Sequence, residues 1–276
     1  MSDVILVTGT SSGIGLHTAV ELGRRGHTVV ATMRDPARGD ALRAAADEAG
    51  VQLDVRALDV VDHDSARACV EGVVADHGRV DVLLNNAGRG AVATAEQLSL
   101  DEVRAQLEVN YLGPVALTKL VLPHMRAAGA GRILTVTSVG GAVGQPFADA
   151  YCGAKFAVEG FMQSLATVML AHGVRVSVIE PAAVASDFVG NVDRPRESRA
   201  DDPYAAQLDA YLARAEVSFA AAQPASEAAA AIADAATSED YRFRWHTSDA
   251  AAAFAGLSLG DIDGSRVLGT TRTWIE

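Results

Sequence analysis

A tyrosine and a lysine stand four residues apart in the segment AYCGAKFAVEG, at Tyr151 and Lys155. On a helix, this spacing places the two side chains on one face, one turn apart. A tyrosine that exchanges a proton with a substrate oxygen near neutral pH needs a stabilised phenolate, because its free pKa is about 10. An ammonium at about 4 Å contributes roughly 4 kcal/mol at an effective dielectric constant of about 20, before desolvation is subtracted. The pair therefore predicts proton transfer to or from a substrate oxygen.

Lysine is rare in this chain. Lys119 and Lys155 are the only lysines among 23 basic side chains, and the others are arginines. A compact ammonium fits beneath a tyrosine and beside the hydroxyl groups of a ligand, whereas the guanidinium fork is broad. We interpret Lys155 as a lysine needed for its chemistry and Lys119 as a solvated side chain on a helix.

A glycine-rich loop, TGTSSGIG at residues 8–15, follows the apolar run at 4–8. Its glycines allow a sharp turn and a close approach of the backbone to a ligand, and they let the next helix pack on the sheet. The first amides of that helix then point toward an anion. Because the loop follows a first strand and opens a helix, it predicts a pyrophosphate site. The loop residues assigned to this site are Gly9, Ser11, Ser12, Gly13, Ile14 and Gly15.

Six short runs rich in β-branched residues alternate with helix-length segments: 4–8, 28–32, 51–58, 80–86, 132–138 and 174–180. This alternation predicts βαβ units and a parallel sheet. The runs are almost continuously apolar, as in strands that helices cover on both faces, and right-handed crossovers make such a sheet doubly wound. We therefore expect a single α/β domain over 1–276 with a doubly wound parallel sheet, the Rossmann fold. One more strand is expected at 241–247.

The sequence pattern changes at residues 186–203, which are rich in charges and prolines and show no clear period. A helical pattern follows at 204–219. We interpret the region of about 186–222 as a lid over the substrate, although a plain connecting loop accounts for the same composition. An alanine-rich helix is expected at 225–236, with Ser226 as its cap.

Three motifs occur together in the order that one protein family shows. The glycine loop has the spacing GxxxGxG, Asn85-Asn86-Ala87-Gly88 follows the fourth predicted strand, and Tyr151-x-x-x-Lys155 comes later. With these motifs the chain resembles the short-chain dehydrogenase/reductase family. The segments TGTSSGIGLH, ATMRD and SVGGAVGQPFADAYCGAKFAVEG are most similar to its branch of 17β-hydroxysteroid dehydrogenase type 1 and retinol dehydrogenases. The resemblance implies hydride transfer between a nicotinamide cofactor and a ketone or alcohol.

The resemblance also implies a catalytic set of four residues. Ser138, thirteen residues before Tyr151, corresponds to the serine that hydrogen-bonds the substrate carbonyl, where it supports the oxygen as negative charge develops. Asn110, in LEVNYLG, corresponds to the asparagine that distorts its helix and holds a water linking the lysine to solvent. Tyr151 is then the proton donor and Lys155 its supporting cation.

Further residues belong to the cofactor site by the same resemblance. Asp59 corresponds to the aspartate that contacts the adenine amino group, although it also suits a helix cap. Pro181-Ala182 stands where the family has proline-glycine, and Ser186 stands where it has threonine. The residues implied beyond the glycine loop are Asp59, Val60, Asn86, Ala87, Gly88, Tyr151, Lys155, Pro181, Val184 and Ser186.

The end of the second predicted strand, VVATMRDPAR, favours NADP(H) over NAD(H). A carboxylate there binds a free ribose 2′-hydroxyl but repels a 2′-phosphate, whereas a guanidinium binds the phosphate with two hydrogen bonds. The strand ends in Met33 followed by Arg34. In the resembling enzymes the residue before the arginine determines which of the two cofactors is preferred. Two observations point the other way: the carboxylate of Asp35 favours NAD(H), and Arg34 also fits the description of a solvated loop residue with no role in binding. Ser12 offers a second contact to the phosphate.

We therefore expect an NADP-dependent ketoreductase that interconverts an apolar ketone and a secondary alcohol of steroid, retinoid or polyketide type. Steroid enzymes of the branch use a lid histidine, and Ala206 stands in its place here. One alternative is a reductase of 3-oxoacyl or polyketide thioesters, for which Arg194, Arg196 and Arg199 offer a cationic patch. Another is a protein that senses NADPH without turnover, although a sensor has no use for the proton donor.

Composition narrows the partners of the protein. A net charge of −12 and a pI near 5.0 argue against nucleic acid. No apolar stretch approaches the roughly 20 residues of a membrane span, and no basic segment leads the N-terminus, so a cytoplasmic protein is expected. Cys69 and Cys152 fit reduced thiols. The seven histidines lack metal-ligand spacing, so no metal is expected.

The resemblance implies a homodimer or homotetramer that packs through the helices expected at about 100–127 and 150–170. Four large apolar side chains of the second helix suit such a partner, and they suit the core of the chain's own fold equally well. They are Phe156, Phe161, Met162 and Met169.

Overall fold

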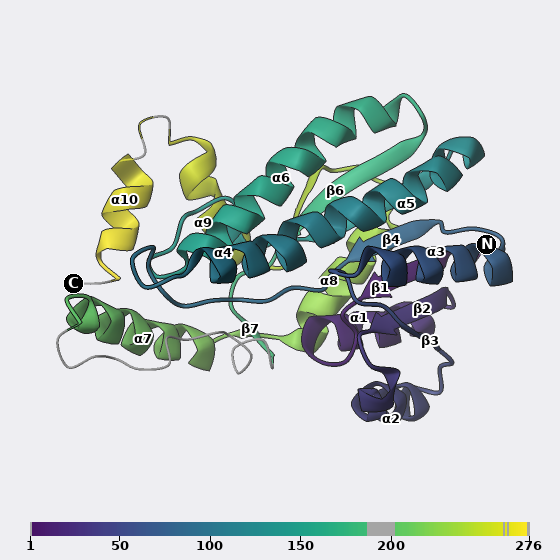
Figure 1. Cartoon of the computed structure of the whole chain (residues 1–276), viewed down its shortest axis with the longest axis horizontal. Coiled ribbons are helices and arrows are strands. Elements are labelled where there is room, and N and C mark those ends of the chain that lie inside the picture. The colour runs from purple at the N-terminus through teal and green to yellow at the C-terminus, as the bar shows by residue number, and fades with distance from the viewer. Residues whose placement is uncertain (1, 187–201, 262, 264, 275–276) are drawn as a thin grey trace.

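The computed structural model of the chain describes residues 2–186, 202–261, 263 and 265–274. Seven parallel strands form one sheet in the order β3-β2-β1-β4-β5-β6-β9 (Figure 1). They are β1 (Val4–Thr8), β2 (Thr28–Met33), β3 (Asp54–Ala57), β4 (Val82–Asn85), β5 (Gly131–Val136), β6 (Val174–Glu180) and β9 (Arg244–His246). The chain order reverses beside β1, which pairs with β2 on one side and β4 on the other. Sheets of this kind bind ligands beyond the carboxyl ends of the strands at such a reversal.

Helices cover both faces of the sheet (Figure 1). The first face packs against α3 (His63–His77), α5 (Gly113–Ala128) and α6 (Asp149–Leu170), and the second against α1 (Gly13–Arg24), α2 (Asp40–Ala49) and α8 (Ala225–Thr237). Leu83 and Leu84 are adjacent in β4, and both are fully buried, one in each core. Successive strand residues point to opposite faces, so this pair confirms that both faces are covered. The doubly wound α/β fold predicted from the sequence is confirmed.

The strands agree with the predicted runs, although several are shorter. β1 and β6 coincide with the predicted runs 4–8 and 174–180. The run 51–58 contracts to the four residues of β3, because only these residues pair with β2. The run 241–247 contracts to β9 for the same reason, since pairing with β6 involves only Arg244–His246.

The predicted cap of the alanine-rich helix is wrong. α8 begins at Ala225, so Ser226 lies inside its first turn and Pro224 occupies the N-cap position. Pro224 also ends β8 (Gln223–Pro224), which pairs with β7 (Val184–Ala185). The strand pairing thus continues up to the helix, and the proline, whose φ is fixed, makes the transition between them.

Three further helices lie together at one end of the molecule, namely α7 (Ala205–Ala220), α9 (Asp249–Leu259) and α10 (Ser265–Arg272) (Figure 1). α7 confirms the helix predicted at 204–219. The first part of the predicted lid, 187–201, lies outside the described residues, together with Arg194, Arg196 and Arg199. No helix in the described part of the chain is long and apolar enough to cross a membrane.

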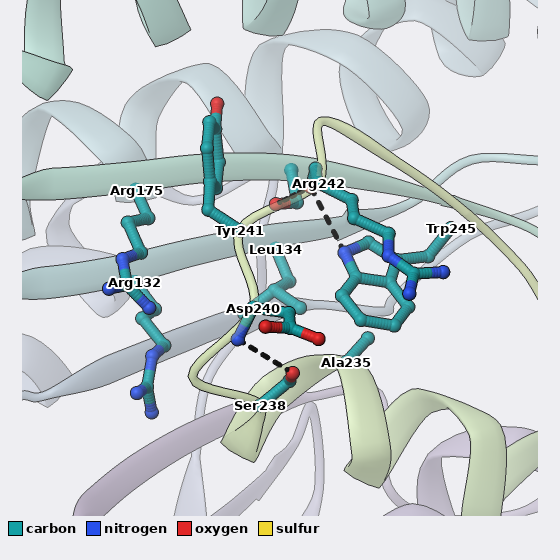
Figure 2. Close-up of a pocket in the computed structure, with 10 residues that line it drawn as sticks. Arg132, Leu134, Arg175, Ala235, Ser238, Asp240, Tyr241, Arg242 and Trp245 are labelled. Carbon is teal, nitrogen blue, oxygen red and sulfur yellow. Dashed lines mark hydrogen bonds between the residues drawn. The ribbon is translucent and has the colours of Figure 1, made fainter.

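A small pocket lies near the amino-terminal ends of β5 and β6 (Figure 2). Arg132 and Arg175, the second residues of these strands, line it together with Tyr241 and Trp245. Its volume of about 10 Å³ admits about one water molecule. The Arg132 guanidinium pairs with the Glu239 carboxylate at 3.1 Å. This pocket has no room for an organic ligand, and it lies at the opposite end of the strands from the glycine loop.

Candidate active site

The glycine loop, residues 8–15, is packed so tightly that it has no room for larger side chains at two positions. A Cβ atom on Gly15 would lie 2.2 Å from the carbonyl oxygen of Gly9 and 2.3 Å from Nδ2 of Asn86. Gly9 has a φ of +71°, which favours glycine, and a Cβ atom there would lie 2.8 Å from Cα of Ala87. The loop therefore offers bare backbone at the carboxyl end of β1, as a bound pyrophosphate requires.

The first turn of α1 is open to an anion. Ser12 is the N-cap of α1, yet its hydroxyl makes no capping hydrogen bond, and the first turn contains no acidic residue. The leading amides therefore keep their capacity to bind a negatively charged group. A Cβ atom on Gly13 would lie 3.2 Å from Cβ of Ser186, and Ile14 packs against Val184. The structure thus brings the predicted residues Val184 and Ser186 to the glycine loop.

The segment that follows β4 is hydrogen-bonded to the glycine loop. The Asn86 side chain donates hydrogen bonds to the carbonyl oxygens of Thr8 and Gly9, at 2.8 and 3.0 Å. The Thr8 hydroxyl in turn accepts from the backbone amides of Asn86 and Ala87, at 2.9 and 3.0 Å. Asn86 and Ala87 therefore fix the shape of the loop.

The end of β2 presents an arginine, followed by an aspartate that caps the next turn. Met33 is buried in the core, whereas Arg34 is exposed. The Asp35 carboxylate accepts a hydrogen bond from the Ala37 amide at 3.0 Å and caps the 3₁₀ turn Pro36–Arg38. Arg34 and Asp35 are both exposed, and the hydrogen bond to the Ala37 amide holds the Asp35 carboxylate toward the following turn.

Asp59 and Val60 lie past the end of β3, where the resemblance places them near adenine. The Asp59 carboxylate accepts from the Val61 amide at 3.2 Å, and its own amide donates to the Ser65 hydroxyl at 3.1 Å. Asp62, and not Asp59, caps α3, since its carboxylate accepts from the amides of Asp64 and Ser65. The helix-cap alternative for Asp59 is therefore wrong. Val60 is buried.

Three of the four predicted catalytic residues meet beyond the carboxyl end of β5. Tyr151 and Lys155 lie on α6, and the Lys155 ammonium is 5.8 Å from the centre of the Tyr151 ring. Ser138 forms a hydrogen bond with Tyr151, and its hydroxyl also accepts from the Gly140 amide at 3.0 Å. Lys155 donates to the carbonyl oxygen of Val136 at 3.0 Å. Helix α6 and the end of β5 together position this group.

Pro181 lies beside this group. Its carbonyl oxygen accepts a hydrogen bond from the Val139 amide at 3.0 Å, directly after Ser138. The predicted residue after β6 is thus held against the segment that contains the serine.

Burial shifts the pKa values of the pair in opposite directions. It raises the pKa of Tyr151 above its usual value, and the hydrogen bond from Ser138 opposes this shift. It lowers the pKa of Lys155 to about 8, and the nearby negative charge of Glu159 opposes this shift. The phenol therefore holds a proton to donate, while the lysine titrates close to neutral pH.

Asn110 lies in a distorted part of its helix. The π-helix Glu108–Leu112 interrupts the path from α4 (Leu100–Leu107) to α5. The Asn110 side chain accepts from the Arg89 amide at 3.2 Å and donates to the Arg89 carbonyl at 2.9 Å. A Cβ atom on Gly88 would lie 3.1 Å from Oδ1 of Asn110 and 3.7 Å from Nζ of Lys155. Gly88 therefore lets the asparagine and the lysine approach each other.

Two aromatic side chains face each other between α7 and the segment before α6. The Tyr211 ring on α7 lies 5.7 Å from the ring of Phe147, whose φ of 57° is in the left-handed region. Burial raises the pKa of Tyr211, and the Coulomb interaction with Cys152 adds to the increase. The Tyr204 hydroxyl, just before α7, donates to the Glu96 carboxylate at 2.5 Å. The described part of the predicted lid thus rests on the segments that border the site.

Sequence reasoning missed two buried residues at this site. Glu159 continues the spacing of Tyr151 and Lys155 by four more residues, and its carboxylate accepts from the Thr137 hydroxyl at 2.8 Å. The signal for Glu159 was present in AYCGAKFAVEG, since residues at i, i+4 and i+8 share a helix face. Thr137 had no such signal, because its partner lies 22 residues away.

The fold and site define a dinucleotide-binding α/β protein whose tyrosine and lysine lie beside the glycine loop. The chain matches the family of short chain dehydrogenases over residues 3–197, and it belongs to the short-chain dehydrogenase/reductase family. This confirms the resemblance on which the site residues were assigned. Structures of this fold are known with NADP and with NAD bound.

Two curated relatives share the predicted branch. The chain is 42% identical to retinol dehydrogenase 8 of Homo sapiens over 192 residues, which are 68% of this chain and 61% of that protein. It is 39% identical to 17-beta-hydroxysteroid dehydrogenase type 1 of Homo sapiens over 273 residues, which are 95% of this chain and 82% of that protein. The match to the first therefore spans less than two thirds of its length.

A solved structure matches nearly the whole chain. A short-chain dehydrogenase from Streptomyces avermitilis superposes with a TM-score of 0.83 at 30% identity, covering 98% of this chain and 97% of that one. The likeness includes the C-terminal part, for which the sequence pattern gave least information.

Proposed function

We propose that the protein is an NADP(H)-dependent oxidoreductase that interconverts an apolar ketone and a secondary alcohol. One observation supports this above the others. A proton donor, Tyr151, is hydrogen-bonded to Ser138 and has the Lys155 ammonium 5.8 Å from its ring centre. This group lies at the same edge of the sheet as a loop that is shaped for a pyrophosphate.

The residues around the glycine loop fit a nicotinamide dinucleotide. Larger side chains at Gly9 and Gly15 would collide with backbone, so the bare loop and the open first turn of α1 are available to the pyrophosphate. Val184 and Ser186 pack beside this turn, and Asp59 and Val60 follow β3, where the adenine is expected. When bound, the cofactor supplies or accepts the hydride.

The proton transfer uses the chain's own residues. In ketone reduction Tyr151 donates its phenolic proton to the carbonyl oxygen, whose carbon gains the hydride, and an alcohol forms. With substrate bound, the Ser138 hydroxyl donates its hydrogen bond to the same oxygen instead of to Tyr151 and stabilises the charge that develops there. The Lys155 ammonium stabilises the phenolate left on Tyr151. Alcohol oxidation follows the reverse path, with the phenolate accepting the hydroxyl proton.

Preference for NADP(H) rests on Arg34. Its guanidinium is exposed at the end of β2, where the adenosine ribose is expected, and it can bind a 2′-phosphate through two hydrogen bonds. The competing carboxylate of Asp35 is engaged with the Ala37 amide. The Ser12 hydroxyl makes no capping bond and supplies a second contact.

An apolar substrate is supported by Tyr211 of α7, which is close enough to Tyr151 to interact with it electrostatically and whose ring faces that of Phe147. The two curated relatives are named for retinol and a hydroxysteroid, which are bulky apolar molecules. The thioester alternative relies on Arg194, Arg196 and Arg199, which are outside the described residues. A protein that senses NADPH without turnover would not need the arrangement of Ser138, Tyr151 and Lys155.

We also infer that residues 1–276 act as one cofactor-binding domain, that about 186–222 closes over the substrate, and that two or four copies associate. For association, Phe156 on α6 is 45% exposed and Leu112 beside α5 is 38% exposed. Phe161, by contrast, packs edge-on against Tyr111, and Met162 is fully buried. Light scattering of wild type beside Phe156→Arg tests this, and an unchanged mass of one chain in both would contradict it.

The proposed function is tested by NADPH consumption with a panel of bulky apolar ketones and 3-oxoacyl thioesters, repeated with NADH. Turnover of a bulky ketone with NADPH is expected. Turnover confined to thioesters would support the alternative substrate class, and tight NADPH binding without turnover of any ketone would support the sensor.

A further inference from the structure

Glu159 lies on the face of α6 that carries Tyr151 and Lys155, one turn beyond the lysine. Its side chain is only 4% exposed, and the proposed reaction does not use it. A buried carboxylate destabilises a fold unless it is paired and hydrogen-bonded. The groups that Glu159 contacts therefore indicate its role.

The first partner connects Glu159 to the segment that holds Ser138. Oε1 of Glu159 accepts a hydrogen bond from the Thr137 hydroxyl at 2.8 Å. Thr137 follows Val136, whose carbonyl accepts from Lys155, and precedes Ser138. Two successive turns of α6 thus bind two consecutive residues at the end of β5. The helix with the proton donor is fixed against the strand that leads to the serine.

The close approach of Glu159 depends on a glycine. Gly141 ends the 3₁₀ turn Val139–Gly141 that follows Ser138. A Cβ atom on Gly141 would lie 2.4 Å from Oε1 of Glu159. The carboxylate therefore lies directly against the backbone of the turn that positions the Ser138 hydroxyl.

The charged partners come from other strands. Oε2 of Glu159 accepts from Nη1 of Arg244 in β9 at 2.5 Å, and the same nitrogen pairs with the fully buried Glu180 at the end of β6. Nε2 of His246 lies 2.8 Å from Oε2 of Glu180, without the alignment of a hydrogen bond. The groups around the Glu159 carboxylate are thus Lys155, Thr137, Arg244 and Glu180, with His246 behind Glu180.

These neighbours determine the ionisation of Glu159. Burial and then the charge of Glu180 raise the pKa of Glu159 to about 7, while Arg244 and Thr137 oppose the increase. The ionised carboxylate, which Arg244 and Thr137 favour, raises the pKa of Lys155 against the effect of burial and so favours its ammonium form.

We propose that Glu159 is a positioning residue for the catalytic group: through Thr137 it holds Ser138 opposite Tyr151, and through its charge it keeps Lys155 protonated. The consequences for turnover rest on the proposed function. The effect on Lys155 does not, because it requires only the folded chain.

Two substitutions separate the effect of the Glu159 charge from the effect of its side-chain length. Glu159→Gln keeps the size of the side chain and removes its charge, while Arg244 stays paired with Glu180. Glu159→Asp keeps the charge but is one methylene too short to reach both Thr137 and Arg244. We expect Glu159→Gln to lower the pKa of Lys155 by about one unit. We expect Glu159→Asp to lower kcat by about tenfold, with a smaller change in the titration of the lysine.

The lysine titration is measured by NMR of protein labelled with ¹³C at the lysine ε-carbon. The chain contains two lysines, so two signals are expected, and the exposed Lys119 is the internal control. Lys119→Arg assigns the signals. Equal titration of Lys155 in wild type and in folded Glu159→Gln would overturn the electrostatic part of the proposal. Because this measurement needs no substrate, it gives an answer even where wild type turns over none of the ketones.

Thr137→Val tests whether Glu159 positions Ser138 through Thr137. It also provides a test of the proposal if Glu159→Gln does not fold. It removes the hydrogen bonds of the Thr137 hydroxyl to Glu159 and to the carbonyl oxygen of Ile179 and keeps the carboxylate, so kcat should fall by several-fold while the pKa of Lys155 changes less than in Glu159→Gln. An unchanged kcat in Thr137→Val would overturn this part. Glu239→Gln, whose side chain is 86% exposed near the far ends of the strands, is the control expected to change neither readout.

Discussion

The Lys155 ammonium lies 5.8 Å from the centre of the Tyr151 ring and donates its hydrogen bond to the carbonyl oxygen of Val136. In the proposed reaction the lysine therefore acts on the phenol through its charge, while the strand backbone fixes its position. This arrangement allows the effects of proton donation, charge and cofactor binding to be tested separately.

Tyr151→Phe removes the phenolic proton and keeps the ring. Ketone reduction should fall by at least about 100-fold, since a positioned acid contributes at least that much. NADPH binding, measured by fluorescence titration, should stay within about threefold of wild type, because the loop at Gly9 and Gly15 is untouched. Loss of both turnover and binding, or of neither, would contradict the assignment of Tyr151 as proton donor.

Arg34→Ala should lower kcat/KM with NADPH by roughly 10- to 100-fold, because charge-assisted hydrogen bonds to a phosphate are lost. kcat/KM with NADH should change little, because that cofactor has no 2′-phosphate. Arg38→Ala, an exposed arginine of the adjacent turn, is the matched control and should leave the ratio of the two cofactors unchanged. A wild-type enzyme that prefers NADH would refute the role given to Arg34.

Activity and the contribution of Lys155 to stability should change in opposite directions at alkaline pH. Burial lowers the pKa of Lys155 from 10.5 in the unfolded chain to about 8, so ketone reduction should fall as pH rises through about 8 and the ammonium is lost. Between these two values the unfolded chain binds more protons than the folded one. The free energy of unfolding contributed by this group therefore increases with pH in that window.

Urea unfolding of wild type and Lys155→Met at about pH 7 and 10 measures this effect on stability. The difference between the two proteins isolates the lysine from other titrating groups. The stability of wild type relative to Lys155→Met should increase from the lower to the higher pH. A constant difference would show that the folded-state pKa of Lys155 is not depressed.

Gly15→Ala should destabilise the protein by about 1–3 kcal/mol, because its methyl group would overlap backbone of Gly9 and the Asn86 amide. NADPH affinity should fall with it, since the loop must shift. Gly256→Ala is the matched control in an exposed part of α9, where a Cβ atom meets nothing within 4 Å. It should stabilise the helix by up to about 1 kcal/mol. Thermal unfolding with and without NADPH compares the two variants, and equal effects would show that the loop tolerates a side chain.

The parts of the fold that sequence could predict are those specified by local pattern. β1 and the glycine loop are consecutive, and Tyr151 and Lys155 share one helix, so spacing alone identifies them. The group around Glu159 could not be predicted in this way. Arg244 lies 85 residues from Glu159, and β9 reaches the site only because it pairs with β6 at the edge of the sheet.

The error at Ser226 has a similar cause. Serine before an alanine-rich run is a reasonable cap by local preference. The start of α8 is instead determined by the pairing of β8 with β7, a contact between segments almost 40 residues apart in the chain. Long-range pairing of two short strands leaves no periodic signal in the sequence.

Trp274, near the end of the described residues, provides an intrinsic fluorescent probe. The Arg214 guanidinium of α7 lies 4.8 Å above the Trp274 ring, and that ring stacks on Phe254 of α9 at 5.6 Å. The second tryptophan, Trp245, is in β9. Fluorescence emission from a Trp245→Phe variant therefore reports on α7, the helix that carries Tyr211, and a change on adding substrate would indicate that α7 moves.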